Sequence, residues 1–138
     1  MTEKQALLKA IAMWEFIKKE HLNKGGQYDL IGYSNIYSKT SIEYAKFCYV
    51  RNYEYLNIMR DCYLCEYALQ KANEENKKSI CQFCPVKNWH IYRDKGKECS
   101  TCCKGGSVYT QANKFKVIDD TLELLKETYN NYCNNNND

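Results

Sequence analysis

The chain has 138 residues and a formal net charge of +3, and 44% of its residues are hydrophobic. This length suits one domain with a modest core. Lysines and arginines never form a run longer than two residues, which argues against a strongly basic protein that follows nucleic-acid phosphates. No apolar stretch reaches membrane-spanning length, and charges interrupt residues 1–16, so no signal peptide is recognisable. We therefore expect a soluble, cytoplasmic protein.

The N-terminal segment predicts an amphipathic helix over residues 2–23. Thr2 and Gln5 have the spacing of a capping box, and Gly25-Gly26 favours an end just beyond the helix. Apolar residues recur on one face at helical spacing: Leu7, Ala10, Ile11, Trp14 and Ile17. We expect this face, including Trp14, to lie in the core.

A second helix is predicted after a turn-rich loop at residues 27–39. Thr40 and Glu43 offer another capping box, and apolar residues up to Met59, Leu56 among them, follow near helical spacing. This helix should run toward the first cysteine pair.

Tyrosines are concentrated in this part of the chain, with nine of the thirteen between residues 28 and 67. Such rings either build the core with their hydroxyls near water or form a binding surface. A core role is favoured, because a chain of this length has few other large apolar groups.

Two further helices are predicted, over residues 66–78 and 115–132. The apolar face of the last helix contains Phe115, Ile118, Leu122, Leu125, Tyr129 and Tyr132. Its other faces contain Asp119, Asp120, Glu123, Lys126 and Glu127. The apolar face needs a partner, and the N-terminal helix offers one. The sequence thus predicts an all-α domain over residues 1–133, with irregular cysteine-rich loops and a disordered tail at 134–138.

The cysteines give the most specific signal in the sequence. Seven of the nine lie between residues 62 and 103, and six of these form three Cys-x-x-Cys pairs. The first two pairs are Cys62/Cys65 and Cys81/Cys84. Two such pairs at this separation are typical of a structural zinc site, in which four thiolates surround one Zn²⁺ ion. Reduced buried thiols, or disulfides in an exported protein, are the alternatives.

The remaining cysteines are less specific. A second metal site could be formed by His90, Cys99, Cys102 and Cys103. Cys48 and Cys133 are expected to be buried thiols. Thiol redox chemistry at a Cys-x-x-Cys pair is a further alternative, although no alternating strand pattern surrounds these pairs.

The most basic local patch suggests a different function. It combines cations with rings that could stack on bases: Trp89, Tyr92, Arg93, Lys95, Lys97 and Lys104. These residue types in one segment are those of a single-stranded nucleic-acid binder. No phosphate-binding glycine loop or nucleophile elbow is recognisable, so we expect a protein without enzymatic activity.

Residues 62–67 (CYLCEY) and 81–86 (CQFCPV), with Trp14 upstream and Tyr109 downstream, resemble small cysteine-rich proteins of unknown function from tailed bacteriophages. The resemblance covers roughly residues 5 to 115. It implies a phage accessory protein in a bacterial cytoplasm and no particular mechanism. The leading hypothesis is therefore a zinc-stabilised module that contacts another protein, such as a host defence or replication factor.

Overall fold

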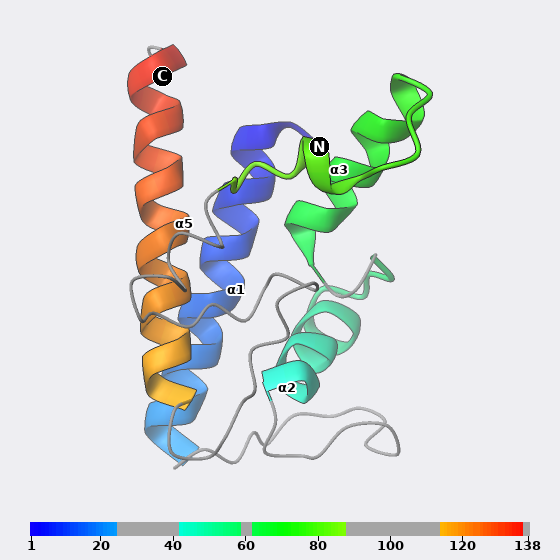
Figure 1. The fold of residues 1–138 in the computed structure, drawn as a ribbon. Helices are drawn as coiled ribbons and strands as arrows, with labels where there is room; N and C mark the ends of the chain where they lie inside the picture. Colours follow the sequence, from blue (N-terminus) through cyan, green and yellow to red (C-terminus); the bar gives the residue numbers. More distant parts are fainter. Residues whose placement is uncertain (25–41, 59–61, 88–113, 137–138) are drawn as a thin grey trace.

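The computed structural model describes residues 1–24, 42–58, 62–87 and 114–136 (Figure 1). Within these ranges every regular element is helical, which confirms the all-α expectation. The elements are α1 (Glu3–Lys24), α2 (Ile42–Cys48), the π-helix η1 (Tyr49–Tyr53), α3 (Tyr63–Glu74), the 3-10 helix η3 (Cys81–Phe83) and α5 (Lys114–Asn136).

The start of α1 is fixed by the predicted capping box. The backbone N–H of Gln5 donates to Oγ1 of Thr2 at 3.1 Å, and the backbone N–H of Thr2 donates to Oε1 of Gln5 at 2.9 Å. This reciprocal pair satisfies groups that the helix itself leaves without partners. The helix therefore begins at Glu3, close to the predicted position.

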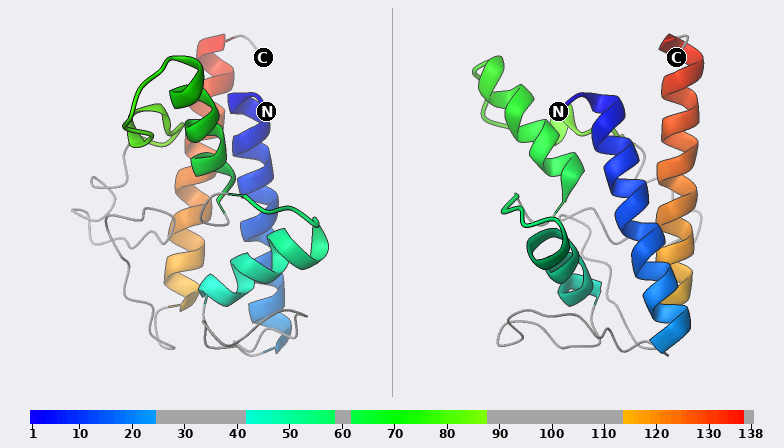
Figure 2. Two further views of the ribbon diagram at one scale, coloured as in Figure 1. Left: turned by 90° about the vertical axis from the view of Figure 1, so that its right-hand side faces the viewer. Right: turned by 180° about the vertical axis from the view of Figure 1, so that it is seen from behind.

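Helices α1 and α5 lie side by side and run in opposite directions, as the views of Figures 1 and 2 agree. Trp14 and Leu122 belong to one buried cluster, so the predicted packing of the two terminal helices is confirmed. At the edge of this interface, Lys18 pairs with Asp119 at 2.8 Å, and Lys126 pairs with Glu15. Both pairs are solvent-exposed and contribute little stability compared with the apolar core.

Helices α2 and α3 contact α1 on its other side, so α1 is the central element of the described part of the chain (Figure 2). The core draws apolar side chains from all four helices: Leu7, Trp14, Ile17, Ala45, Tyr63, Leu64, Ile118 and Leu125. Tyr63 is buried, and Tyr67, Tyr129 and Tyr132 pack partly against this cluster. For these tyrosines the core role is confirmed.

The second helix is shorter than predicted. Helix α2 continues into the π-turn η1, which ends at Tyr53, and residues 54–58 are not helical. The chain leaves the helix because Tyr55 adopts a positive φ of 56°, a conformation that no right-handed helix contains. Leu56, expected on the buried face, is consequently exposed.

The third helix begins earlier than predicted, at Tyr63 instead of residue 66, and it ends at Glu74. Its end is a Schellman motif in which Asn76 has a φ of 55°. The N–H of Lys77 donates to the carbonyl of Ala72 at 2.8 Å, and the N–H of Asn76 donates to that of Asn73 at 3.3 Å. The early start places Cys65 inside the first turn of α3.

The last helix also differs in detail from the prediction. Ile118, Leu122 and Leu125 are buried as expected, but Asp120 is also buried, although it was expected on an outer face. Helix α5 continues to Asn136 and so includes residues 134–136 of the expected disordered tail. In the described ranges no helix is long and apolar enough to cross a membrane.

Candidate metal centre

The first cysteine pair lies at the start of α3. Cys62 is the residue that precedes the helix, with extended backbone angles (φ −134°, ψ 116°), and Cys65 lies one turn into it. Cys62 is 3% exposed and belongs to the core cluster, whereas Cys65 is partly buried against it. A helical first turn places residues three apart on the same side, so the two thiols face one another.

The two thiols interact directly. A hydrogen bond from Cys65 is the largest of the effects that lower the pKa of Cys62 to about 6. The positive charge of Lys46 and the backbone amides of Cys65 and Leu64 lower it further, and burial opposes them. The same hydrogen bond, followed by burial, raises the pKa of Cys65. The pair therefore holds one proton between two sulfurs, with the negative charge on Cys62.

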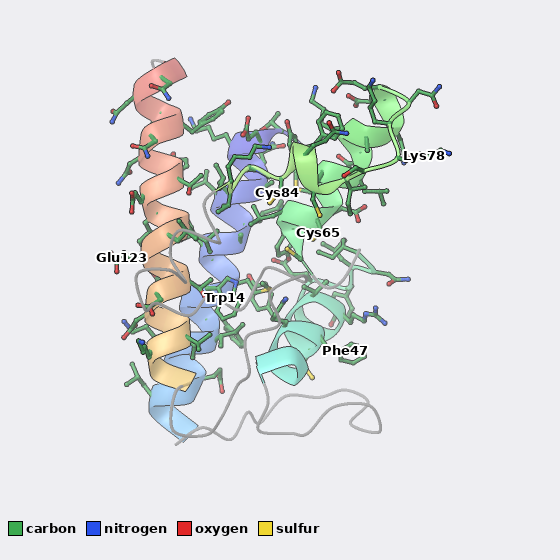
Figure 3. The ribbon with its side chains drawn as sticks, in the orientation of Figure 1. Trp14, Phe47, Cys65, Lys78, Cys84 and Glu123 are labelled. Atoms are coloured by element: carbon green, nitrogen blue, oxygen red, sulfur yellow. The ribbon has the colours of Figure 1, made fainter. Side chains whose placement is uncertain are left out.

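A third thiol approaches this pair from the segment that follows α3. The negative charge of Cys84 contributes to the raised pKa of Cys65, which places the two residues near one another. Figure 3 shows Cys84 beside the part of α3 that contains Cys65. Burial of Pro85 and Val86 fixes the chain immediately after Cys84. We refer to Cys62, Cys65 and Cys84 as the thiol cluster.

The fourth predicted ligand, Cys81, is exposed at the start of η3. It is linked to Cys84 through one turn of backbone, in which the N–H of Cys84 donates to the carbonyl of Cys81 at 3.2 Å. In the described ranges no group of three or more histidine, cysteine or carboxylate side chains has an arrangement ready to hold a metal ion. The four thiols nevertheless match the donor chemistry of zinc, since three are close together and the fourth is in the adjoining turn.

Around η3 the chain forms a tight turn. The N–H of Phe83 donates to the carbonyl of Ile80 at 2.9 Å, and the side-chain amide of Gln82 donates to the carbonyl of Ser79 at 3.0 Å. The ammonium group of Lys87 donates to the carbonyl of Gln82. These contacts hold the second Cys-x-x-Cys pair against α3.

Sequence reasoning did not identify Lys46 as part of this region. Lys46 is 8% exposed on α2, and its charge acts on both Cys62 and Cys65. Lysine is rarely buried, so the residue type gives no signal in the sequence. Only the packing of α2 near the start of α3 brings this cation to the thiols.

Several predicted site residues lie outside the described residues. These include the alternative second metal site of His90, Cys99, Cys102 and Cys103. They also include the basic patch of Trp89, Tyr92, Arg93, Lys95, Lys97 and Lys104. Of the two cysteines predicted to be buried thiols, Cys48 is fully buried and Cys133 on α5 is partly buried.

A cavity of about 330 Å³ lies elsewhere, between the start of α1, α3 and the C-terminal part of α5. Its walls include Glu3, Tyr67, Lys71, Glu74 and Tyr132. The thiol cluster does not line this cavity, so the two features are separate.

Comparisons of the chain with protein-family models, with curated proteins and with solved structures find no match. The proposed function therefore depends on the residues and their geometry.

Proposed function

We propose that this protein is a non-enzymatic binding module, whose helical fold is stabilised by one Zn²⁺ ion and whose exposed surface contacts another protein. The observation that carries the proposal is the thiol cluster, in which Cys62 and Cys65 share a proton next to Cys84. Zinc would be held by these three thiolates together with Cys81. Four protein ligands leave the ion no open position for water or substrate, so its role is structural.

The position of the cluster supports a structural role for the metal. Cys62 lies in the core that unites the terminal helices, and η3 contacts α3. A metal ion at this point would fix the segment after α3 to the start of that helix. Free energy gained from binding zinc is then also free energy of folding.

Tyr55 supports a protein-binding surface. Its side chain is 86% exposed, although its backbone is in the left-handed region, where residues other than glycine pay a steric cost. The turn is held by two hydrogen bonds, from the N–H of Glu54 to the carbonyl of Tyr49 and from the N–H of Leu56 to that of Val50. Backbone strain retained beside a π-helical turn is frequent at functional positions, and tyrosine is common among binding hot spots.

Nearby, the guanidinium group of Arg51 lies 4.7 Å from the ring centroid of Phe47 on the same helical stretch. Arginine and aromatic residues are enriched in interfaces. We therefore propose that residues 51–56 form the centre of the partner-binding surface. In the phage setting implied by the sequence resemblance, the partner would be a host factor.

Thiol redox chemistry is a second candidate, and the location of Cys62 and Cys65 at the start of α3 favours it. A Cys-x-x-Cys pair at a helix N-terminus, with the charge on the first sulfur, is the arrangement used in disulfide exchange. However, the attacking thiol in such chemistry must reach its substrate, and Cys62 is 3% exposed. Burial together with a third nearby thiol agrees better with a metal site.

Elemental analysis of the purified protein tests the zinc proposal. We expect about one zinc per chain, lost when Cys62 and Cys65 are both replaced by serine and retained when Cys133 is replaced by serine. Two zinc ions per chain would add the group of His90, Cys99, Cys102 and Cys103 as a second site. A folded protein without metal would contradict the proposal and return thiol redox chemistry to first place.

The binding surface is tested by affinity capture from a bacterial lysate with matched variants. A specific partner should be retained by the parent protein and by a Lys78→Ala control, and lost with Tyr55→Ala. Lys78 suits the control because it is exposed on the turn that follows α3 (Figure 3). A salt-dependent gel shift with single-stranded DNA or RNA would instead support the basic patch as the functional surface.

A further inference from the structure

Lys46 on α2 is an unusual residue for the interior, because it is 8% exposed. Among the described residues no carboxylate forms an ion pair with it, although a buried ammonium group normally requires a compensating charge. The negative partners given for it are sulfurs: its charge acts on Cys62 and on Cys65. Lys46 therefore lies on the buried side of the thiol cluster.

A zinc ion bound by four thiolates carries a net double negative charge, since four sulfur anions surround a divalent cation. In a partly buried site this charge is costly unless nearby positive groups or N–H donors stabilise it. The backbone amides at the start of α3 provide part of this stabilisation. Lys46 is a full positive charge in the same place.

We propose that Lys46 is a positioning residue of the metal centre, whose ammonium group neutralises part of the thiolate charge and orients Cys62 and Cys65 toward the ion. This inference rests on the proposed zinc site. It explains why a lysine occupies a buried position on α2, where an apolar residue would pack at lower cost. It also gives α2 a direct connection to the metal, so that metal binding and the packing of α2 are coupled.

The competing explanation is that Lys46 only packs its aliphatic stem in the interior and extends its charge toward solvent. Two replacements separate the explanations. Methionine has nearly the length of the lysine stem and suits a buried position, but carries no charge. Arginine keeps the charge and adds bulk.

The test is a metal titration of the reduced, metal-free chain, with Co²⁺ as a coloured probe and with Zn²⁺ in competition with a chelator. We expect Lys46→Met to weaken zinc affinity by about tenfold to a hundredfold, as removal of a group that supports metal ligands usually does. Lys46→Arg should remain close to the parent. Lys71→Met is the matched control, because it removes a partly exposed lysine of α3 that pairs with Glu74 at 3.7 Å.

The absorption spectrum provides a readout that packing alone would not change. Without the nearby cation the thiolates donate electrons more readily, so the sulfur-to-cobalt band should move to lower energy in Lys46→Met and not in Lys46→Arg. A Lys46→Met chain that stays unfolded in saturating zinc while Lys46→Arg folds would also support the inference, since methionine is the better packing residue.

Equal losses in both variants, or an unchanged affinity in Lys46→Met, would overturn the role of Lys46 and leave the zinc site in place. A parent protein that binds neither Zn²⁺ nor Co²⁺ would overturn the proposed function itself. The two failures are therefore distinguishable.

Discussion

The φ of 56° at Tyr55 is a conformation that glycine adopts without steric cost. Asn76, at φ 55° after α3, occupies the same region, but asparagine is one of the residues that tolerate it. Tyrosine has no such tolerance, and its exposed ring gains little from packing within the chain. The steric cost at Tyr55 therefore has no visible return in the stability of the fold.

We predict that Tyr55→Gly raises the free energy of unfolding by roughly 0.5 to 1 kcal/mol. Relief of the left-handed strain contributes about 1 to 2 kcal/mol, and the greater freedom of glycine in the unfolded chain removes about 0.4 to 1 kcal/mol of that gain. Urea denaturation measures the difference, and Asn76→Gly should gain less. Partner binding should weaken in the same Tyr55→Gly protein. A destabilised Tyr55→Gly would mean that the ring is held by the fold.

The thiol pair predicts a pH dependence in the metal-free protein. The pKa of Cys62 is lowered from 9.0 to about 6, so the unfolded chain binds one more proton than the folded chain between these values. This contribution to stability is complete above pH 9 and is lost as the pH falls through 6. The raised pKa of Cys65 acts in the opposite direction above pH 9.

The measurement is denaturation of the reduced, metal-free protein at several pH values between 6 and 9, with Cys62→Ala for comparison. Stability should rise with pH in the parent, and the rise should be smaller in the variant. Parallel curves for the two proteins would show that Cys62 does not titrate in this range.

At the scale of elements, α1 is the helix on which the others pack. It contacts α5 on one side and α2 and α3 on the other. Its sequence alternates sharply between faces, since Leu7 is fully buried while Leu8 is 42% exposed. The opposite side of the interface is made by α5, where Leu122 is 4% exposed.

We predict that Leu122→Ala lowers the free energy of unfolding by about 2 to 5 kcal/mol, because it leaves a cavity between α5 and α1. Leu8→Ala is the matched control and should change stability by less than about 0.5 kcal/mol. Thermal or urea denaturation of both variants measures the contrast. Similar small losses in the two proteins would indicate that α5 is free to bind a partner.

For the whole molecule, the proposed zinc site joins the segment after α3 to the core. A single lost ligand should therefore affect the complete fold. In Cys65→Ser we expect helicity, thermal stability and partner binding to fall together, with a decrease in melting temperature of about 10 °C or more. Cys133→Ser changes a partly buried thiol of α5 outside the thiol cluster and should melt close to the parent.

Circular dichroism during thermal unfolding measures both variants. A Cys65→Ser protein that melts like the parent but has lost its function would contradict a structural metal. That result would favour reactive thiols, because activity would then depend on the sulfur and not on the fold.

Local patterns in the sequence determined the helical class and the terminal helices. The capping box of Thr2 and Gln5 fixes where α1 begins, and helical spacing identifies Trp14 and Leu122 as core residues. These features depend on neighbours three or four positions apart, which a linear sequence displays directly. The pairing of the two Cys-x-x-Cys motifs is readable for the same reason.

Tertiary structure alone decided the features that depend on distant neighbours. Hydrophobic spacing continued past Tyr53, but the backbone of Tyr55 ends the second helix there, and the strain at Tyr55 is not encoded in its residue type. Lys46 and Asp120 are polar residues that the sequence would leave in solvent, yet both are buried. Their burial results from the packing of elements far apart in the chain, and that packing also brings Lys46 to the cysteines.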